Sequence, residues 1–311
     1  MSGIHHVTAI AGDASRNLDF YTNVLGMRLV KKTVNFDDPG TYHFYFGDET
    51  GTPGTILTFF PWADAPRGRN GVGAAQQTMF RVPESAMGYW VHRFVDKGVV
   101  HEAIEKRFGH SVLAFRDPDG MDLALVGIPG AEAEAAWQGG DVPAEHALRG
   151  FYGVSLLLED ATRTGAILTD VFGFAETASE GPFKQFVAKG ADVGGVIEIR
   201  EAKGFLAAQL GRGSVHHVAF RAASDDAQAE MRKKLVEKHR MRPTEQVNRD
   251  YFRSIYFREP GGVLFEIATD QPGFAVDEPL ATLGQSLKLP QFLEGQRKEI
   301  EAVLQPLGQA A

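Results

Sequence analysis

The chain is a succession of short runs in which apolar and polar residues alternate, a pattern typical of half-buried strands. The first run covers residues 3–10. Residues 15–25 follow with apolar positions at helical spacing, and this pattern stops at Gly26. Three further strand-like runs occupy 27–35, 41–46 and 55–60. The pattern therefore predicts a unit made of a strand, a helix and three strands.

The same order recurs along the rest of the chain. Strand-like runs begin near residues 4, 77, 152 and 216, and this period of roughly 65–75 residues indicates one module in four copies. The turns 115–120 and 257–262 support the alignment, because their sequences are similar and each precedes a final strand. The expected strands and helices of the later copies are 78–82, helix 89–98, 110–115 and 121–126; 151–158, helix 162–171, 185–188 and 196–199; and 215–221, helix 225–239, 252–257 and 263–268.

We expect an α+β fold in which the four βαβββ modules pair into two domains. The predicted N-terminal domain covers 1–130 and the C-terminal domain covers 150–272, each with two modules. Residues 131–149, rich in Ala, Glu and Gly, are the expected linker. Residues 273–311 form a tail with one amphipathic helix at 290–304, which would serve for packing or for subunit contact in a homo-oligomer.

Composition narrows the possible chemistry and partners. The 311 residues are 43% apolar and 23% charged, as in globular domains, and include ten His but no Cys. Any metal site must therefore use imidazole and carboxylate ligands. The net charge of −8 argues against nucleic acid and anionic membranes as partners. No targeting segment opens the chain and no run is long enough for a membrane span, so we expect a cytoplasmic protein.

Alignment of the modules identifies unusual strand positions. The first-strand position holds His6, Gln77, Gly153 and His217, and the last-strand position holds Thr58, Ala124, either Glu198 or Ile199, and Glu266. A carboxylate in an apolar strand is costly to bury unless it is paired or bound to metal. Two imidazoles and one carboxylate with open positions are the ligand set of non-haem Fe(II) oxygen chemistry. The alignment predicts that His6, His217 and Glu266 bind one divalent cation.

Strand parity decides between neighbouring histidines. Successive side chains face opposite sides of a strand, so only one member of each His-His pair points directly inward. Val7 and Val218 belong on the helix-covered face, and this assigns His6 and His217 as the ligands.

Ordinary structural roles compete with this interpretation. Glu266 could instead be a buried ion-pair partner of Arg249 or Arg253, and Glu198, in a similar apolar context, is interpreted as structural. The other histidines are assigned to the surface or to packing: His43, His92, His101, His110, His146 and His239. Aromatic residues near the site strands are candidate walls of a pocket for a planar substrate: Phe44, Phe46, Phe59, Phe252 and Phe257.

The modules resemble the vicinal oxygen chelate superfamily, which contains glyoxalase I and extradiol dioxygenases. Within it, several stretches look like the hydroquinone-cleaving ring dioxygenases: 4–8, 42–46, 51–55, 215–220 and, most specifically, 249–262. The resemblance covers about residues 3–275 and implies the iron ligands His6, His217 and Glu266. It also implies catalytic roles for His5, Thr8, His216, Arg249 and Tyr256.

The resemblance implies an Fe(II)-dependent, extradiol-type dioxygenase that opens hydroquinone-type rings with O₂. Mn(II) would suit the same donor set. One alternative is a glyoxalase-type isomerase or lyase, whose site would hold Zn or Ni and more carboxylates. The other is a non-catalytic protein that sequesters a small aromatic molecule and needs no metal. Bound metal would distinguish the three.

Overall fold

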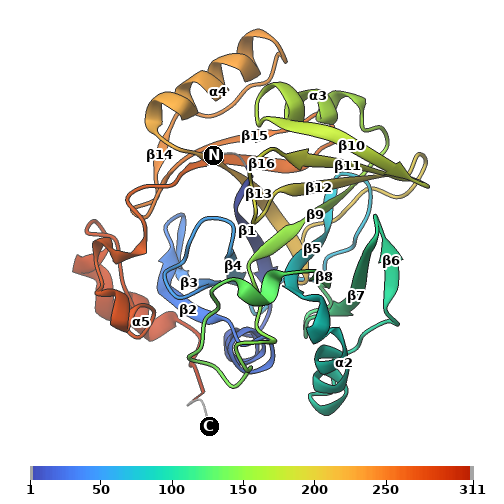
Figure 1. Ribbon diagram of the computed structural model, residues 1–311. Coiled ribbons are helices and arrows are strands. Elements are labelled where there is room, and N and C mark those ends of the chain that lie inside the picture. Colours follow the sequence, from blue (N-terminus) through green and yellow to red (C-terminus); the bar gives the residue numbers. More distant parts are fainter. Residues whose placement is uncertain (1–2, 309–311) are drawn as a thin grey trace.

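The computed structural model describes residues 3–308 as an α+β fold of four modules (Figure 1). The first module contains β1 (Ile4–Ala11), α1 (Ala14–Asp19), a π-helical turn (Phe20–Val24), β2 (Arg28–Asn35), β3 (Asp38–Gly47) and β4 (Ile56–Pro61). The second contains β5 (Ala74–Pro83), α2 (Met87–Asp96), β6 (Glu105–Arg107), β7 (His110–Arg116) and β8 (Asp122–Ile128).

The remaining two modules repeat this order. The third contains β9 (Phe151–Leu158), α3 (Thr162–Asp170), β10 (Phe174–Glu180), β11 (Phe183–Ala188) and β12 (Val196–Glu201). The fourth contains β13 (Ser214–Ala222), α4 (Asp225–Glu237), β14 (Val247–Asn248), β15 (Arg253–Arg258) and β16 (Leu264–Thr269), and the tail contains α5 (Arg297–Val303). The fold class expected from the sequence is confirmed.

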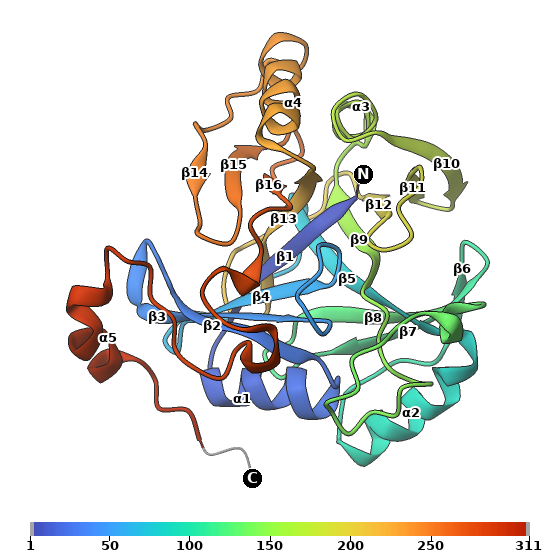
Figure 2. The same cartoon turned by 60° about the vertical axis from the view of Figure 1, so that its left-hand side comes forward.

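Each of the two eight-stranded sheets joins two modules, the first and last of the chain in one sheet and the middle two in the other. One sheet has the order β14-β15-β16-β13-β1-β4-β3-β2 and combines modules one and four, and the other, β10-β11-β12-β9-β5-β8-β7-β6, combines modules two and three. Helices α1 and α2 lie on one side of the molecule, and α3 and α4 lie on the opposite side (Figure 2). Each sheet thus contains strands from both expected domains, 1–130 and 150–272. The division of the chain into these two domains stays a prediction.

The strands that the sequence pattern missed lie at or beside the sheet edges. β6, β10 and β14 have no run of alternating apolar residues, and each is the terminal strand of its sheet. An edge strand buries less side-chain surface than a central strand, so its sequence carries a weaker hydrophobic signal. The expected tail helix at 290–304 is also shorter, because only Arg297–Val303 is α-helical, after a 3₁₀ turn at Glu294–Gln296.

Alternate residues of the central strands face two different environments. Val7, Val218 and Phe265 are fully buried in the main hydrophobic core. The residues that alternate with them along each strand, such as His6 on β1 and His217 on β13, lie on the other face of the same sheet. This alternation, which follows from the period of two along a strand, leaves one face of the first sheet available for polar side chains.

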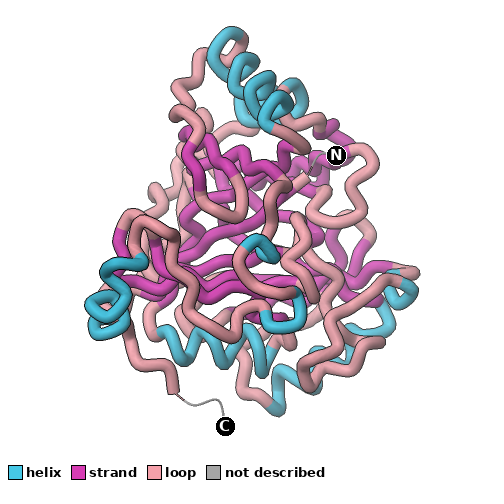
Figure 3. Tube along the Cα trace, turned by 90° about the vertical axis from the view of Figure 1, so that its left-hand side faces the viewer, coloured by secondary structure: helices cyan, strands magenta, loops and turns pink. Residues whose placement is uncertain are grey.

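The tail packs against the outer strands of the first module. Leu289, Leu293, Ile300 and Leu304 form a buried cluster with Val34 of β2. Figure 3 shows this side of the molecule from the front. The packing role expected for the tail is therefore observed. No helix within residues 3–308 is long and apolar enough to cross a membrane.

A buried lysine fixes the tail to β2. The ammonium group of Lys31, which has 0% exposure, lies 2.5 Å from the carboxylates of both Asp277 and Glu278. It also lies 4.9 Å from the centre of the Tyr251 ring. A buried charge without its partner is strongly unfavourable, so the two carboxylates and the lysine depend on one another.

We predict that Lys31→Met lowers the free energy of unfolding by about 3–5 kcal/mol, because Glu278 would be left buried without a counter-charge. Urea unfolding followed by circular dichroism measures this. Lys233→Met, at an exposed position of α4, is the control and should change stability by less than about 0.5 kcal/mol. Equal stability of the two variants would contradict the assigned role of Lys31.

Candidate metal centre

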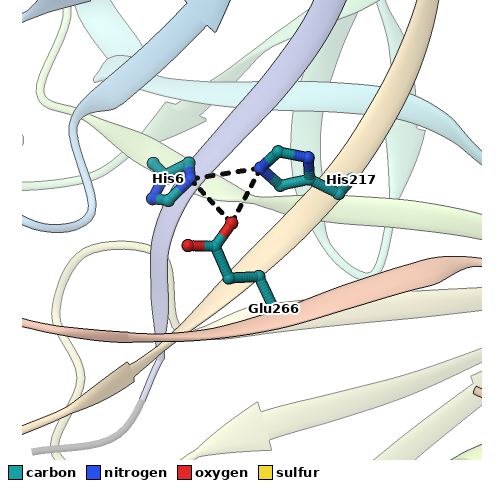
Figure 4. Close-up of side chains that lie close together, drawn as sticks. All are labelled: His6, His217 and Glu266. Carbon is teal, nitrogen blue, oxygen red and sulfur yellow. Dashed lines mark hydrogen bonds and ion pairs between the residues drawn. The ribbon is translucent and has the colours of Figure 1, made fainter. Parts of the chain in front are cut away.

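Three neighbouring strands place His6, His217 and Glu266 together (Figure 4). The antiparallel register of β1 and β13 pairs His6 with Ala219 and Thr8 with His217, and the parallel register of β13 and β16 pairs Ala219 with Glu266. All three side chains therefore project from one face of the sheet. The convergence depends on the pairing of modules one and four, since His6 and Glu266 lie near opposite ends of the sequence.

The geometry of the three side chains fits one metal ion. The Nε2 atoms of His6 and His217 are 3.3 Å apart, and they lie 3.3 and 2.9 Å from Oε2 of Glu266. Ligand atoms in adjacent positions around an ion at about 2.1 Å are separated by about 3.0–3.4 Å. Oε2 is buried without a hydrogen-bond donor. The residues present therefore suit a divalent cation, and they form the only such cluster within residues 3–308.

Each ligand histidine is oriented by the histidine before it. Nδ1 of His6 lies 2.9 Å from Nδ1 of His5, and Nδ1 of His217 lies 2.8 Å from Nδ1 of His216. Burial lowers the pKa of His5 well below its usual value and that of His216 to about 3, so both remain neutral. When Nε2 of His6 and of His217 binds a cation, the ring proton of each is on Nδ1 and is donated to the preceding histidine. Such outer partners commonly fix the tautomer of a metal-binding histidine.

A β-bulge explains how both His5 and His6 are buried near the site. Ile4 pairs with Phe220, and His6 pairs with Ala219. The chain thus advances by two residues along β1 but by only one residue along β13. His5 is the extra residue, and its ring packs 5.2 Å from the ring of Phe252. Strict alternation of side chains therefore applies to Val7 and beyond but not to His5.

Glu266 is held as a carboxylate. Its Oε1 accepts a hydrogen bond of 2.5 Å from Ser254 Oγ. Burial by itself would raise the pKa of Glu266, and positive charge at His6 and His217 would hold that pKa well below its usual range. With both imidazoles neutral, a bound cation would have to supply this charge. Arg249 and Arg253 do not pair with Glu266, because they contact Asp37 and Asp225.

A cavity of about 320 Å³ opens beside the three ligands. Of the residues expected to be catalytic, four line this cavity: Thr8, His216, Arg249 and Tyr256. His5 does not line it and lies behind His6. The size is within the range of small-molecule sites, and a metal-capable cluster at its base marks it as the candidate active site.

Arg249 and Tyr256 form a polar edge of the cavity. Nε of Arg249 donates to the Tyr256 hydroxyl at 3.2 Å, and its Nη2 pairs with the exposed Asp37 at 3.0 Å. Burial and the charge of Glu266 raise the pKa of Tyr256, although Arg249 opposes the shift. Tyr256 therefore retains its proton at neutral pH.

The expected aromatic walls are mostly wrong. Phe252 lines the cavity, but Phe44, Phe46, Phe59 and Phe257 are buried in the main core on the opposite face of the strands. On β3 the residues that alternate with Phe44 and Phe46 face the cavity instead, as strand parity requires. The aromatic residues that line the cavity but were not predicted are Phe36, His43, Tyr45, Phe60 and Trp62.

The second sheet has positions equivalent to those of His6, His217 and Glu266, but its residues there do not form a metal-capable cluster. Gln77 pairs with Ser155 and Ser155 with Glu198, the same relation as His6, Ala219 and Glu266. Glu198 pairs at 3.2 Å with Arg107, whose Nη2 donates to Gln77 at 2.9 Å. The guanidinium thus supplies the positive charge near a carboxylate whose pKa burial raises to about 6.

Gly153 occupies the position of His217 in that second sheet. A Cβ atom there would lie 2.0 Å from the carbonyl oxygen of Val196, so no side chain fits. Two ligand positions are therefore lost, and Glu198 has the structural setting that its sequence suggested.

Comparisons with known proteins identify the family of the chain. The profile described as "Glyoxalase/Bleomycin resistance protein/Dioxygenase superfamily" matches residues 3–125. The chain is 45% identical to the "Putative ring-cleaving dioxygenase MhqO" of Bacillus subtilis (strain 168), over 98% of this chain and 96% of that protein. It is 32% identical to the "Chlorohydroquinone/hydroquinone 1,2-dioxygenase" of Sphingobium indicum, over 96% and 95% of the two chains.

A solved structure also resembles the whole chain. The crystal structure of a "putative dioxygenase" from Bacillus subtilis subsp. subtilis str. 168 is 44% identical and superimposes with a TM-score of 0.94, covering 99% of this chain and 98% of the other.

We predict that the protein binds one divalent ion per chain and that Glu266→Gln abolishes tight binding, because the amide replaces the only charged ligand. Glu198→Gln, at the equivalent position of the second sheet, is the matched control and should retain one ion. Equilibrium dialysis against Fe(II) or Mn(II) under anaerobic conditions measures the stoichiometry. Loss of the ion in the Glu198 variant, or its retention in the Glu266 variant, would contradict the assignment.

Proposed function

Because the chain belongs to the Glyoxalase/Bleomycin resistance protein/Dioxygenase superfamily and within it to the ring-cleaving dioxygenases, we propose that it is an Fe(II)-dependent dioxygenase that opens hydroquinone-type rings with O₂. The observation that carries the proposal is the convergence of His6, His217 and Glu266 at the base of a mainly apolar cavity. Mn(II) would be compatible with the same three ligands.

Iron held by two imidazoles and one carboxylate retains open positions, and it would supply a place where a phenolic oxygen and O₂ meet and exchange electrons. His6, His217 and Glu266 would hold the ion. With one anionic residue among these three, a divalent ion would keep a net positive charge, which would favour the deprotonated form of a phenol.

Arg249 contributes charge stabilisation. Its guanidinium lies at the cavity wall, where it can donate to an oxygen that becomes negative during the reaction. Tyr256 shares a hydrogen bond with it, and interaction with Tyr256 and Asp37 raises the pKa of Arg249 although burial opposes the shift. Arg249 thus remains charged throughout.

Two side chains that can donate or accept a proton also line the cavity. The hydroxyl of Tyr256 and the imidazole of His216 line the cavity and can donate to or accept from a substrate hydroxyl. His216 stays neutral at neutral pH, since burial lowers its pKa to about 3. His5 acts through His6, because it lies behind that ligand and contacts its Nδ1.

The cavity walls suit a flat and largely uncharged ring. Phe60, Trp62, Phe252 and Leu264 provide apolar surface on several sides. The cation of Arg249 is already paired with Asp37. These walls support a dihydroxylated aromatic substrate.

The position of ring cleavage is proposed to be of the extradiol type. In a 1,4-dihydroxylated ring, the bond between carbons 1 and 2 joins a hydroxylated carbon to one without a hydroxyl group. The name of the Sphingobium relative refers to that bond. Cleavage next to a single hydroxylated carbon corresponds to the extradiol pattern.

Two other functions fit the side chains of the site less well. A glyoxalase-type isomerase would use Zn or Ni and a second carboxylate as base, whereas the cluster found within residues 3–308 contains Glu266 alone. A sequestering protein would not require the three ligands.

The expected cytoplasmic location and homo-oligomer stay predictions. Analytical sedimentation of the purified protein would test the oligomeric state.

The proposal is tested by reconstituting the protein anaerobically with Fe(II), adding hydroquinone and then O₂. Consumption of one O₂ per ring opened, followed with an oxygen electrode and by mass spectrometry of the product, is expected. Conversion of a glutathione hemithioacetal by the Zn or Ni form, without oxygen uptake by the Fe(II) form, would favour the isomerase.

Tyr256→Phe should lower kcat by about 100-fold or more while the iron content stays unchanged, because the variant removes a proton donor but no ligand. Steady-state kinetics and metal analysis of the same sample check this. Loss of iron from the variant would show that Tyr256 belongs to the metal-binding shell.

A further inference from the structure

A continuous row of hydrogen bonds leads away from the metal-capable cluster through residues to which the sequence assigned no common role. Thr8 Oγ1 lies 2.8 Å from Thr58 Oγ1. Nε2 of His43 lies 2.9 Å from the same Thr58 oxygen, and the Tyr45 hydroxyl lies 2.9 Å from Nδ1 of His43. These four side chains are named the hydroxyl relay below.

Sheet register explains why the relay ends beside a metal ligand. Thr8 is the cross-strand partner of both His217 and Thr58, and Thr58 is the partner of Tyr45 on the next strand. Thr8, His43 and Tyr45 all line the cavity. The relay thus runs across three strands and reaches the cavity at Thr8, next to His217.

The direction of the hydrogen bonds can be deduced from the donors available. Tyr45 is 3% exposed, and its hydroxyl has no other partner among residues 3–308. If His43 donated to it, the phenolic proton would have no acceptor in the protein, whereas the opposite order leaves the free proton on Thr8, where a substrate oxygen beside His217 can accept it. Tyr45 therefore donates to Nδ1 of His43.

The remaining bonds follow from that first one. Burial lowers the pKa of His43 well below its usual value, so the ring is neutral and carries one proton, on Nε2. Nε2–H donates to Thr58, and the single hydroxyl proton of Thr58 is then given to Thr8. Thr58 is 0% exposed and does not line the cavity, so water does not compete for its hydroxyl. The proton of Thr8 is left to point into the cavity.

We propose that Tyr45, His43 and Thr58 are positioning residues which turn the hydroxyl of Thr8 into a donor toward the substrate oxygen beside His217. This inference rests on the proposed function, since it concerns the oxygen of a phenolic substrate. A donor at that point stabilises the oxygen more strongly once it has lost its proton, because hydrogen bonds to charged groups are stronger than neutral ones. Removal of the relay should thus reduce kcat more than it raises KM.

Thr58→Val is the central variant, because it removes one hydroxyl with little change in shape and leaves Thr8 and His43 in place. The expected result is a fall in kcat of about 10- to 100-fold with unchanged metal content. Thr33→Val is the matched control. Thr33 is a buried threonine paired with His43 across β2 and β3, and its hydroxyl has no partner, so full activity is expected.

Two further variants separate positioning from simple loss of packing. The double variant Thr8→Val/Thr58→Val should be no slower than Thr8→Val, because Thr58 acts only through Thr8. His43→Gln retains an N–H near the position of Nε2 and should be at least fivefold faster than His43→Leu. Additive losses in the double variant, or equal rates of the two His43 variants, would overturn the proposal.

A measurement without turnover tests the relay independently of the reaction. Nitrogen NMR of histidine-labelled, metal-free protein reports the tautomer of His43, assigned by the signal missing in His43→Gln. The Nε2–H form is expected in the native protein, and the Nδ1–H form would overturn the deduced direction. Absence of ring cleavage with an Nε2–H signal would count against the proposed function but would leave the hydrogen-bond order intact.

Discussion

The burial of one carboxylate, Glu266, is the constraint on which the site depends. Moving an unpaired carboxylate into a protein interior costs several kcal/mol even after relaxation. Ser254 satisfies one of its oxygens, and the other faces the Nε2 atoms of His6 and His217 without receiving a hydrogen bond. A divalent cation offsets this cost and uses the same lone pairs. The arrangement is therefore better explained as a set of ligands than as a network that stabilises the fold.

The two sheets show how the same backbone can give different outcomes. In one, modules one and four bring His6, His217 and Glu266 together beside a cavity. In the other, modules two and three keep the carboxylate, Glu198, but place the guanidinium of Arg107 against it. Only a few side chains decide whether a buried acid faces a metal position or an internal cation. The repeated module thus forms two similar sheets, and within residues 3–308 only the first of them carries a metal-capable cluster.

Sequence reasoning predicted the cluster of His6, His217 and Glu266 because the repeat aligned these positions and strand parity chose between neighbouring histidines. The same parity rule separates His43 and Tyr45, which line the cavity, from Phe44, which lies in the core. His43 also had no histidine at the matching place in another module to mark it. The pairing of modules one and four could not be read from local patterns, because strand pairing over such sequence distance is set by packing of the complete fold. Edge strands such as β14 escaped detection because they bury little apolar surface.

The central claim is that one cation is bound jointly by side chains from the two ends of the sequence. Anomalous diffraction at the iron absorption edge, from a crystal of protein loaded anaerobically with Fe(II), tests it most directly. The account predicts a single peak in contact with His6 Nε2, His217 Nε2 and Glu266 Oε2, with the remaining positions open to the cavity. A peak elsewhere, or an ion whose positions are filled by further protein ligands, would contradict it.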